Sequence, residues 1–146
     1  MVRRWSRPES DVQERVEPLT DGERLWIEEN VSAARDIARD AGLEHDGEVT
    51  GETLDDLWIL LQSELADDPN PAINVVGLAL GQLLVDRFGL EWVALTDEHG
   101  TEAAVRGQSN FTVFPANFVA KRYETGETNF IAPFVDEVAQ KLDELA

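Results

Sequence analysis

Residues 70–89 read NPAINVVGLALGQLLVDRFG, and this stretch decides how the rest of the chain can fold. Pro71 suits the first turn of a helix, where its missing amide hydrogen costs nothing, and Gly89 suits a helix end. Gly77 and Gly81 are one helical turn apart and therefore share one face. Because glycine lowers helix stability by roughly 1 kcal/mol relative to alanine, we expect another backbone or a sheet to approach closely there. The stretch predicts the central helix of the domain.

Two further helices are predicted before it. Thr20 and Glu23 have the spacing of a capping box, and apolar residues follow at helical intervals up to Gly42. A polar loop leads to a second apolar stripe over residues 54–65, which predicts another well-buried helix.

The pattern changes after Gly89. Residues 90–96, 101–106 and 111–114 are rich in strand-forming residues and are separated by short turns, which require antiparallel neighbours. Residues 116–123 can form a short helix, and residues 129–145 predict a final one. The expected fold class is α+β: three N-terminal helices, a three-stranded antiparallel meander, and a C-terminal helix packed on the sheet.

The first residues show neither a helical nor a strand period. We therefore expect residues 1–18 to form a flexible arm before a single α+β domain over residues 19–146. Arg3, Arg4 and Arg7 surround Trp5, so a second interpretation is a basic, aromatic strap that lies across the acidic body or a partner.

The charge of the chain is strongly unbalanced. Thirty carboxylates oppose twelve basic residues among 146, the net charge is −18, and only Lys121 and Lys141 among the basic residues are lysine. Such charges repel one another over about 10 Å at about 0.1 M salt but only about 3 Å at about 1 M. The composition favours a halophilic, soluble, cytoplasmic protein. An acidic face that docks a basic partner and a mimic of nucleic-acid charge are the alternatives.

Several classes of protein are disfavoured by the same composition. The negative charge opposes nucleic-acid binding, and no apolar run is long enough to span a membrane. The chain has no cysteine, which excludes a disulfide, a thiol nucleophile and a thiolate zinc site. We expect no cofactor and identify no catalytic residue.

A metal site is one hypothesis for the predicted hairpin at residues 97–100. Asp97, His99 and Glu102 could supply oxygen and imidazole ligands to a divalent metal. The competing interpretation is an ordinary turn, because a tight turn points its side chains outwards and favours aspartate at its start and glycine at its end.

A basic cluster is the other candidate site. Lys121, Arg122 and Tyr123, with Phe118 one turn earlier, could contact an anion or a partner. The alternative is a pair of surface cations that bridge to nearby carboxylates, an arrangement that contributes little.

Four segments in order carry a resemblance to a known family: residues 77–81 (GLALG), 89–92 (GLEW), 97–100 (DEHG), and Phe114-Pro115 followed by Lys121-Arg122. Over roughly residues 20–145 the chain resembles a domain-of-unknown-function family of short bacterial and archaeal α+β proteins, of which it looks like a haloarchaeal member. The resemblance implies a compact α+β domain and carries over no catalytic residue.

The sequence thus favours a small, soluble, halophilic domain without enzymatic activity. It would bind a protein or a small ligand through the outer side of the sheet and residues 115–123. The alternatives are an inhibitor or immunity-type protein that binds a basic partner, and a metal-dependent hydrolase that uses Asp97, His99 and Glu102.

Overall fold

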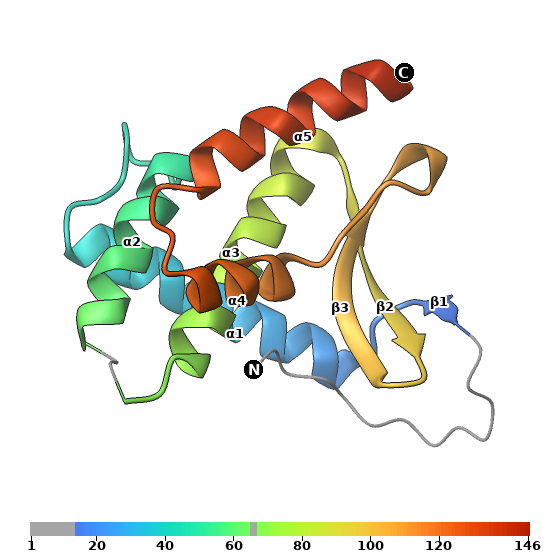
Figure 1. Cartoon of the computed structure of the whole chain (residues 1–146), viewed down its shortest axis with the longest axis horizontal. Helices are drawn as coiled ribbons and strands as arrows, with labels where there is room; N and C mark the ends of the chain where they lie inside the picture. Colours follow the sequence, from blue (N-terminus) through green and yellow to red (C-terminus); the bar gives the residue numbers. More distant parts are fainter. Residues whose placement is uncertain (1–13, 65–66) are drawn as a thin grey trace.

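The computed structural model describes residues 14–64 and 67–146, which form an α+β fold (Figure 1). In these ranges five α-helices accompany a four-stranded antiparallel sheet with strand order β1-β2-β3-β4. In chain order the elements are β1 (Arg15–Glu17), α1 (Asp21–Asp40), α2 (Gly51–Glu64), α3 (Asn70–Phe88), β2 (Glu91–Asp97), β3 (Gly100–Arg106), the 3-10 turn η1 (Gln108–Asn110), β4 (Thr112–Val113), α4 (Pro115–Thr125) and α5 (Ile131–Leu145).

The signals at the start of α1 and at the end of α3 act as the sequence predicts. Thr20 and Glu23 close a capping box before α1: the Thr20 hydroxyl accepts the Glu23 amide at 3.2 Å, and the Glu23 carboxylate accepts the Thr20 amide at 2.9 Å. Gly89 ends α3 with a φ of 70°, a left-handed conformation that glycine adopts without strain. In the described residues no helix is both long and apolar enough to cross a membrane.

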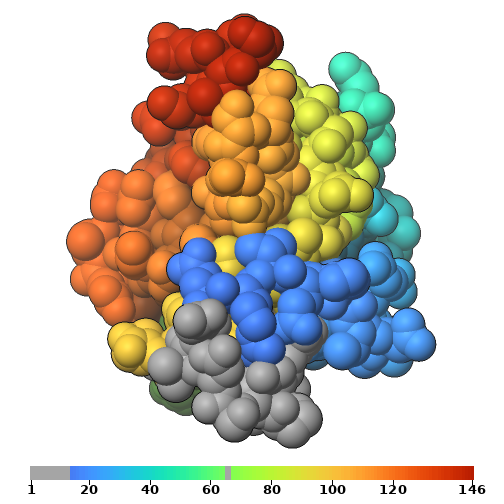
Figure 2. All heavy atoms as spheres, turned by 90° about the vertical axis from the view of Figure 1, so that its right-hand side faces the viewer, coloured from blue at the N-terminus to red at the C-terminus, as the bar shows by residue number. Residues whose placement is uncertain are grey.

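The sheet has one strand more than the sequence predicts. Arg15–Glu17 form β1, which pairs antiparallel with β2 so that Glu17 lies opposite Ala94. This strand belongs to the segment predicted as an arm, and Figure 2 shows the first described residues (blue) lying against the strand segments (yellow to orange). Three residues are too few to show an alternating pattern, so the strand is defined only by its partner. Residues 1–13, including the predicted basic strap, lie outside the described residues.

The position expected for the C-terminal helix was wrong. We expected it on the sheet, whereas α5 packs chiefly against α2 and reaches α3 and η1 with its remaining length (Figure 1). Helices α3 and α4 instead contact the sheet. A helix with one apolar side satisfies its sequence pattern against any apolar surface, so the pattern alone does not choose between a sheet and a helix.

A buried carboxylate joins α5 to α2. The two oxygens of Asp55, a residue only 5% exposed, accept the backbone amides of Ile131 at 2.8 Å and of Ala132 at 3.0 Å. These are orphan amides at the start of α5, which otherwise have no partner within the helix. The helices also approach closely, since a Cβ placed on Gly51 would lie 2.9 Å from the Cα of Ala132. Asp55 therefore fixes the position of α5 from a point 76 residues earlier in the chain.

The glycines of α3 face other elements, as the sequence predicts. A Cβ on Gly77 would lie 2.6 Å from the Cα of Ala116 at the start of α4. A Cβ on Gly81 would overlap the ring of Trp92 in β2 and lie 2.9 Å from Cγ of Pro115. Helices α1, α2 and α4 all pack around α3, so the central helix is confirmed.

We predict that Gly77→Ala lowers the free energy of unfolding by roughly 1–3 kcal/mol, because the new methyl group meets backbone that cannot move aside easily. Chemical denaturation of both proteins measures the difference. Gly22→Ala is the matched control: it lies in the first turn of α1 with no atom within 4 Å of the added Cβ, and it should be neutral or slightly stabilising. Equal stability of Gly77→Ala and the parent protein would contradict the close approach of α3 and α4.

We predict that Asp55→Ala costs about 1–3 kcal/mol of stability, because two buried amides lose their acceptors.

The charge of the Asp55 carboxylate is tested separately, by measuring stability over a series of pH values. Burial raises the pKa of Asp55, while the amides of Ala132 and Ile131 oppose the shift. Since the folded state then binds the proton more tightly than the unfolded state, the contribution of this group to stability is lost as pH rises through its folded pKa.

We compare the melting temperatures of the parent protein and of Asp55→Asn at each pH. The advantage of the parent protein should shrink as pH rises above about 4, the pKa of an ordinary aspartate. Asp136→Asn removes an exposed carboxylate of α5 that is not among the groups acting on Asp55, and it serves as the control. A difference that instead rises with pH would show that the hydrogen bonds outweigh burial.

Candidate functional site

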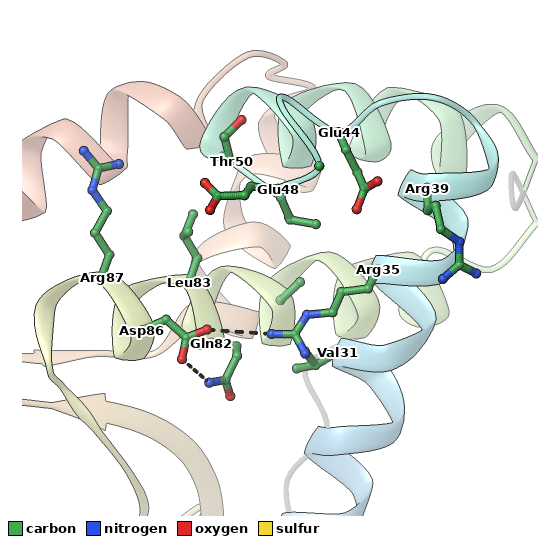
Figure 3. A pocket seen from close by; sticks show the side chains of 13 residues that line it. Val31, Arg35, Arg39, Glu44, Glu48, Thr50, Gln82, Leu83, Asp86 and Arg87 are labelled. Atoms are coloured by element: carbon green, nitrogen blue, oxygen red, sulfur yellow. Dashed lines mark hydrogen bonds and ion pairs between the residues drawn. The ribbon is translucent and has the colours of Figure 1, made fainter.

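A cleft of about 710 Å³ opens between α1, the loop after it, and α3 (Figure 3). We call it the α1–α3 cleft. Its polar rim combines three arginines with three carboxylates, while its apolar lining comes from both helices and the loop. The lining residues are Val31, Arg35 and Arg39 from α1, Glu44, Gly47, Glu48, Val49 and Thr50 from the loop, and Ala79, Gln82, Leu83, Asp86 and Arg87 from α3.

Helix periodicity brings the rim residues together. Arg35 and Arg39 are one turn apart on α1 and are exposed, whereas Val31, one turn before Arg35, is buried. On α3, Asp86 and Arg87 are exposed in the last turns. The cleft thus lies along the edge of the contact between the two helices, where buried side chains give way to charged ones.

A tight hairpin forms the third wall. His45 and Glu48 exchange two backbone hydrogen bonds of 2.9 Å and 3.0 Å, and the two residues between them have positive φ, 53° for Asp46 and 77° for Gly47. Two residues with positive φ are typical of the type I′ turn, for which Asp-Gly is a preferred sequence. The hairpin places Glu48 on the rim opposite α3 (Figure 3).

A chain of polar contacts links the sheet to the floor of the cleft. The indole N–H of Trp92 donates to Oε1 of Gln82 at 3.0 Å, and Nε2 of Gln82 donates to Oδ1 of Asp86 at 2.8 Å. The other oxygen of Asp86 pairs with the Arg35 guanidinium at 3.7 Å. The amide of Gln82 is therefore fixed on both sides, and it orients the carboxylate that holds Arg35.

The ion pairs on the rim are exposed and loose. Side chains of Arg35 and Asp86 are 56% and 58% exposed, and such a pair contributes little to stability. Arg39 pairs within its own helix with Asp36 at 3.3 Å and Asp40 at 3.5 Å. In the described part of the chain, Arg87, Glu44 and Glu48 have no ion-pair partner, and the Arg87 guanidinium lies 5.5 Å from the centre of the Phe88 ring.

The basic cluster predicted from the sequence is largely committed to packing within the domain. Arg122 lies 4.5 Å above the Phe118 ring and pairs with Glu127 at 3.8 Å. Phe118 also stacks on Phe134 with ring centres 4.0 Å apart. Tyr123 packs edge-on against Trp58, and Lys121 is exposed; none of the four predicted residues lines the cleft.

The outer side of the sheet, the other surface expected to bind, is buried in its centre. Ala94 and Ala103 pack with Leu78 of α3, so the alternate residues Leu95, Glu102 and Ala104 belong to the opposite face. Their exposures are only 6%, 6% and 0%.

The residues of the predicted metal site do not converge. The Asp97 carboxylate accepts the backbone amide of His99 at 2.8 Å, which is the hydrogen bond of an ordinary Asx turn. The His99 ring lies 3.4 Å from Glu98 and is 71% exposed, whereas Glu102 is buried within β3. Across residues 14–64 and 67–146, no group of three or more histidine, aspartate or glutamate side chains could hold a metal ion.

A family model describes most of this architecture. The model of the domain of unknown function DUF3806 matches residues 54–134, more than half of the chain. The chain belongs to this family. The match confirms the resemblance to a domain-of-unknown-function family, and it runs from α2 to the first turn of α5. One wall of the cleft, on α3, lies inside the match, whereas Arg35, Arg39, Glu44 and Glu48 precede it.

A solved structure supports the fold. A protein from Bacteroides thetaiotaomicron VPI-5482, known from a crystal structure, is 18% identical in sequence and superposes with a TM-score of 0.66. The similarity covers 87% of this chain but 48% of that protein, so the chain spans about half of its length. No curated protein matches the sequence.

Proposed function

We propose that this domain is a binding module without catalytic activity, and that it holds a small polar molecule in the α1–α3 cleft. One observation carries the proposal: three of the ten arginines of a chain with net charge −18 line a single cleft. Its volume of about 710 Å³ falls within the range of small-molecule sites. Arginine suits such a site because its planar guanidinium recognises carboxylate and phosphate groups through paired hydrogen bonds.

The chemistry of the lining favours binding over catalysis. The lining residues include neither histidine nor cysteine, the side chains that most often act as base or nucleophile. The hydroxyl of Thr50 is engaged in capping α2, where it accepts the Thr53 amide at 3.2 Å and contacts the Thr53 hydroxyl at 3.1 Å. A bound molecule would therefore meet charged groups and hydrogen-bond donors, with no imidazole or thiol among the lining residues.

We expect added ligands to change amide chemical shifts around the cleft. The protein is labelled with ¹⁵N, and small carboxylates, amines, amino acids and inorganic phosphate are added one at a time. Saturable shifts should concentrate at Arg35, Glu48 and Arg87 and their neighbours, and Arg35→Gln should weaken them. Shifts centred instead on Phe118, Lys121 and Tyr123 would move the site to α4 and overturn the cleft proposal.

We also propose that the domain works in concentrated salt. Its exposed surface is rich in carboxylates, with Glu28, Glu29, Asp36 and Asp40 all exposed along α1 alone. Mutual repulsion among these charges opposes the folded state most strongly at low ionic strength. A halophilic setting explains how a chain with net charge −18 stays compact.

The melting temperature should therefore rise by many degrees between about 0.1 M and about 3 M KCl, as the Debye length falls from about 10 Å to below about 3 Å. Circular dichroism at fixed pH measures the transition. Sucrose, which is excluded from protein surfaces but carries no charge, is the control and should have a smaller effect. A melting temperature that does not respond to KCl would contradict the halophilic assignment and favour a basic partner for the acidic surface.

A further inference from the structure

The α1–α3 cleft presents unpaired charges of both signs. Arg35 is held by Asp86, and Arg39 is held by Asp36 and Asp40, so these guanidinium groups already have counterions. Three charged residues remain, namely Arg87 on one side and Glu44 and Glu48 on the other. Within the described residues none of them forms an ion pair. The charges still open to a ligand are thus one cation and two carboxylates.

The three unpaired groups come from different elements. Arg87 stands on the last turn of α3 at one end of the cleft, whereas Glu44 and Glu48 project from the loop between α1 and α2 (Figure 3). The loop residues are held in place by the two backbone hydrogen bonds between His45 and Glu48. Helix α3 and the hairpin thus fix the backbone positions of Arg87 and Glu48 before any ligand arrives, so that only their side chains have to be ordered on binding.

A ligand with only one kind of charge fits this arrangement poorly. A simple anion bound by Arg87 gains one ion pair but also meets the field of Glu44, Glu48 and Asp86, in a protein that is already strongly negative. A simple cation satisfies the glutamates and leaves Arg87 without a counterion. Charges of the wrong sign at a site disfavour such ligands relative to one that pairs with both kinds of charge.

The surface between the charges is apolar. Val31 and Ala79 are buried beneath the cleft, and Val49 and Leu83 are partly exposed along it. A short aliphatic chain can cover these side chains while its two ends reach the charged rim. Burial of such a chain contributes roughly 25 cal/mol for each Å² of apolar surface removed from water.

We infer that the ligand of the α1–α3 cleft is a small molecule with both a carboxylate and an amine, an amino acid or a close analogue. Its carboxylate pairs with Arg87, its ammonium group or groups pair with Glu48 and Glu44, and its carbon chain lies on Val49 and Leu83. This inference rests on the proposed binding function, and it specifies the class of ligand.

Three probes with related carbon chains test it: lysine, hexanoate, which lacks the amines, and cadaverine, which lacks the carboxylate. Titration calorimetry and amide shifts are recorded in the lowest KCl concentration at which the protein stays folded. Lysine should bind at the cleft at least about tenfold more tightly than either single-charge probe, a difference of about 1.4 kcal/mol. Arg87→Gln should reduce the preference of the protein for lysine over cadaverine. Glu48→Gln should reduce its preference for lysine over hexanoate.

Arg24→Gln and Glu28→Gln, exposed positions of α1 that do not line the cleft, are the matched controls and should leave all three affinities unchanged. If hexanoate or cadaverine binds at the cleft as tightly as lysine, the inference fails while the proposed binding function stands. If no amino acid of the wider panel shifts a cleft amide but a compound with charge of only one sign does, the inference likewise fails alone. If no compound of the wider panel shifts these amides, both fail.

Discussion

The close approach of α3 to its neighbours is the constraint on which the rest of the structure depends. With no side chain at Gly77 and Gly81, the helix lies directly against the start of α4 and against Trp92 of the sheet. Interiors are packed so densely that even one methyl group at such a contact requires a backbone shift. The position of α3 then sets the position of everything that packs on it, which includes α1, α2 and α4.

The same contact connects the core to the candidate site. Trp92 packs on Gly81 with its ring and donates through its indole nitrogen to Gln82, the next residue of α3. Gln82 in turn holds Asp86, and Asp86 holds Arg35 across the cleft. A side chain of the sheet therefore orients a charge on the rim through two intermediates. The rim itself is exposed, so the ion pair between Arg35 and Asp86 contributes little to the stability of the fold.

Local signals in the sequence were sufficient to predict most of the helices and the hairpin. The first strand and the placement of the last helix depend on long-range contacts. The capping box at Thr20 and the glycine at 89 act within one turn of the chain, so they can be identified without knowing the fold. Strand β1 has three residues and exists through its pairing with β2. The placement of α5 depends on Asp55, 76 residues away from its partner amide. No periodic pattern contains such information.

The residues of the cleft could not be predicted as a group from the sequence either, because long-range contacts bring them together. Arg35 and Arg39 have helical spacing in the sequence, which predicts only that they share a face of α1. Their relation to Arg87 arises because α3 packs on α1, and the relation to Glu48 arises because the Asp46-Gly47 turn folds the loop back. Conversely, Lys121 and Arg122 stand out in the sequence because basic residues are rare, yet Arg122 is engaged with Phe118 and Glu127.

The family match contains the contacts that hold the domain together and only one wall of the candidate cleft. Residues 54–134 contain Asp55, both glycines of α3, Trp92 and the start of α5, which are the contacts that fix the architecture. The opposite wall of the cleft, with Arg35 and Glu48, is built from residues that precede the match. The matched region therefore contains these contacts together with Asp86 and Arg87, while the charges that face them come from α1 and its loop. The selectivity that we propose, for a ligand with two charges, depends on both walls, because among the described residues neither wall alone offers an unpaired cation and an unpaired carboxylate.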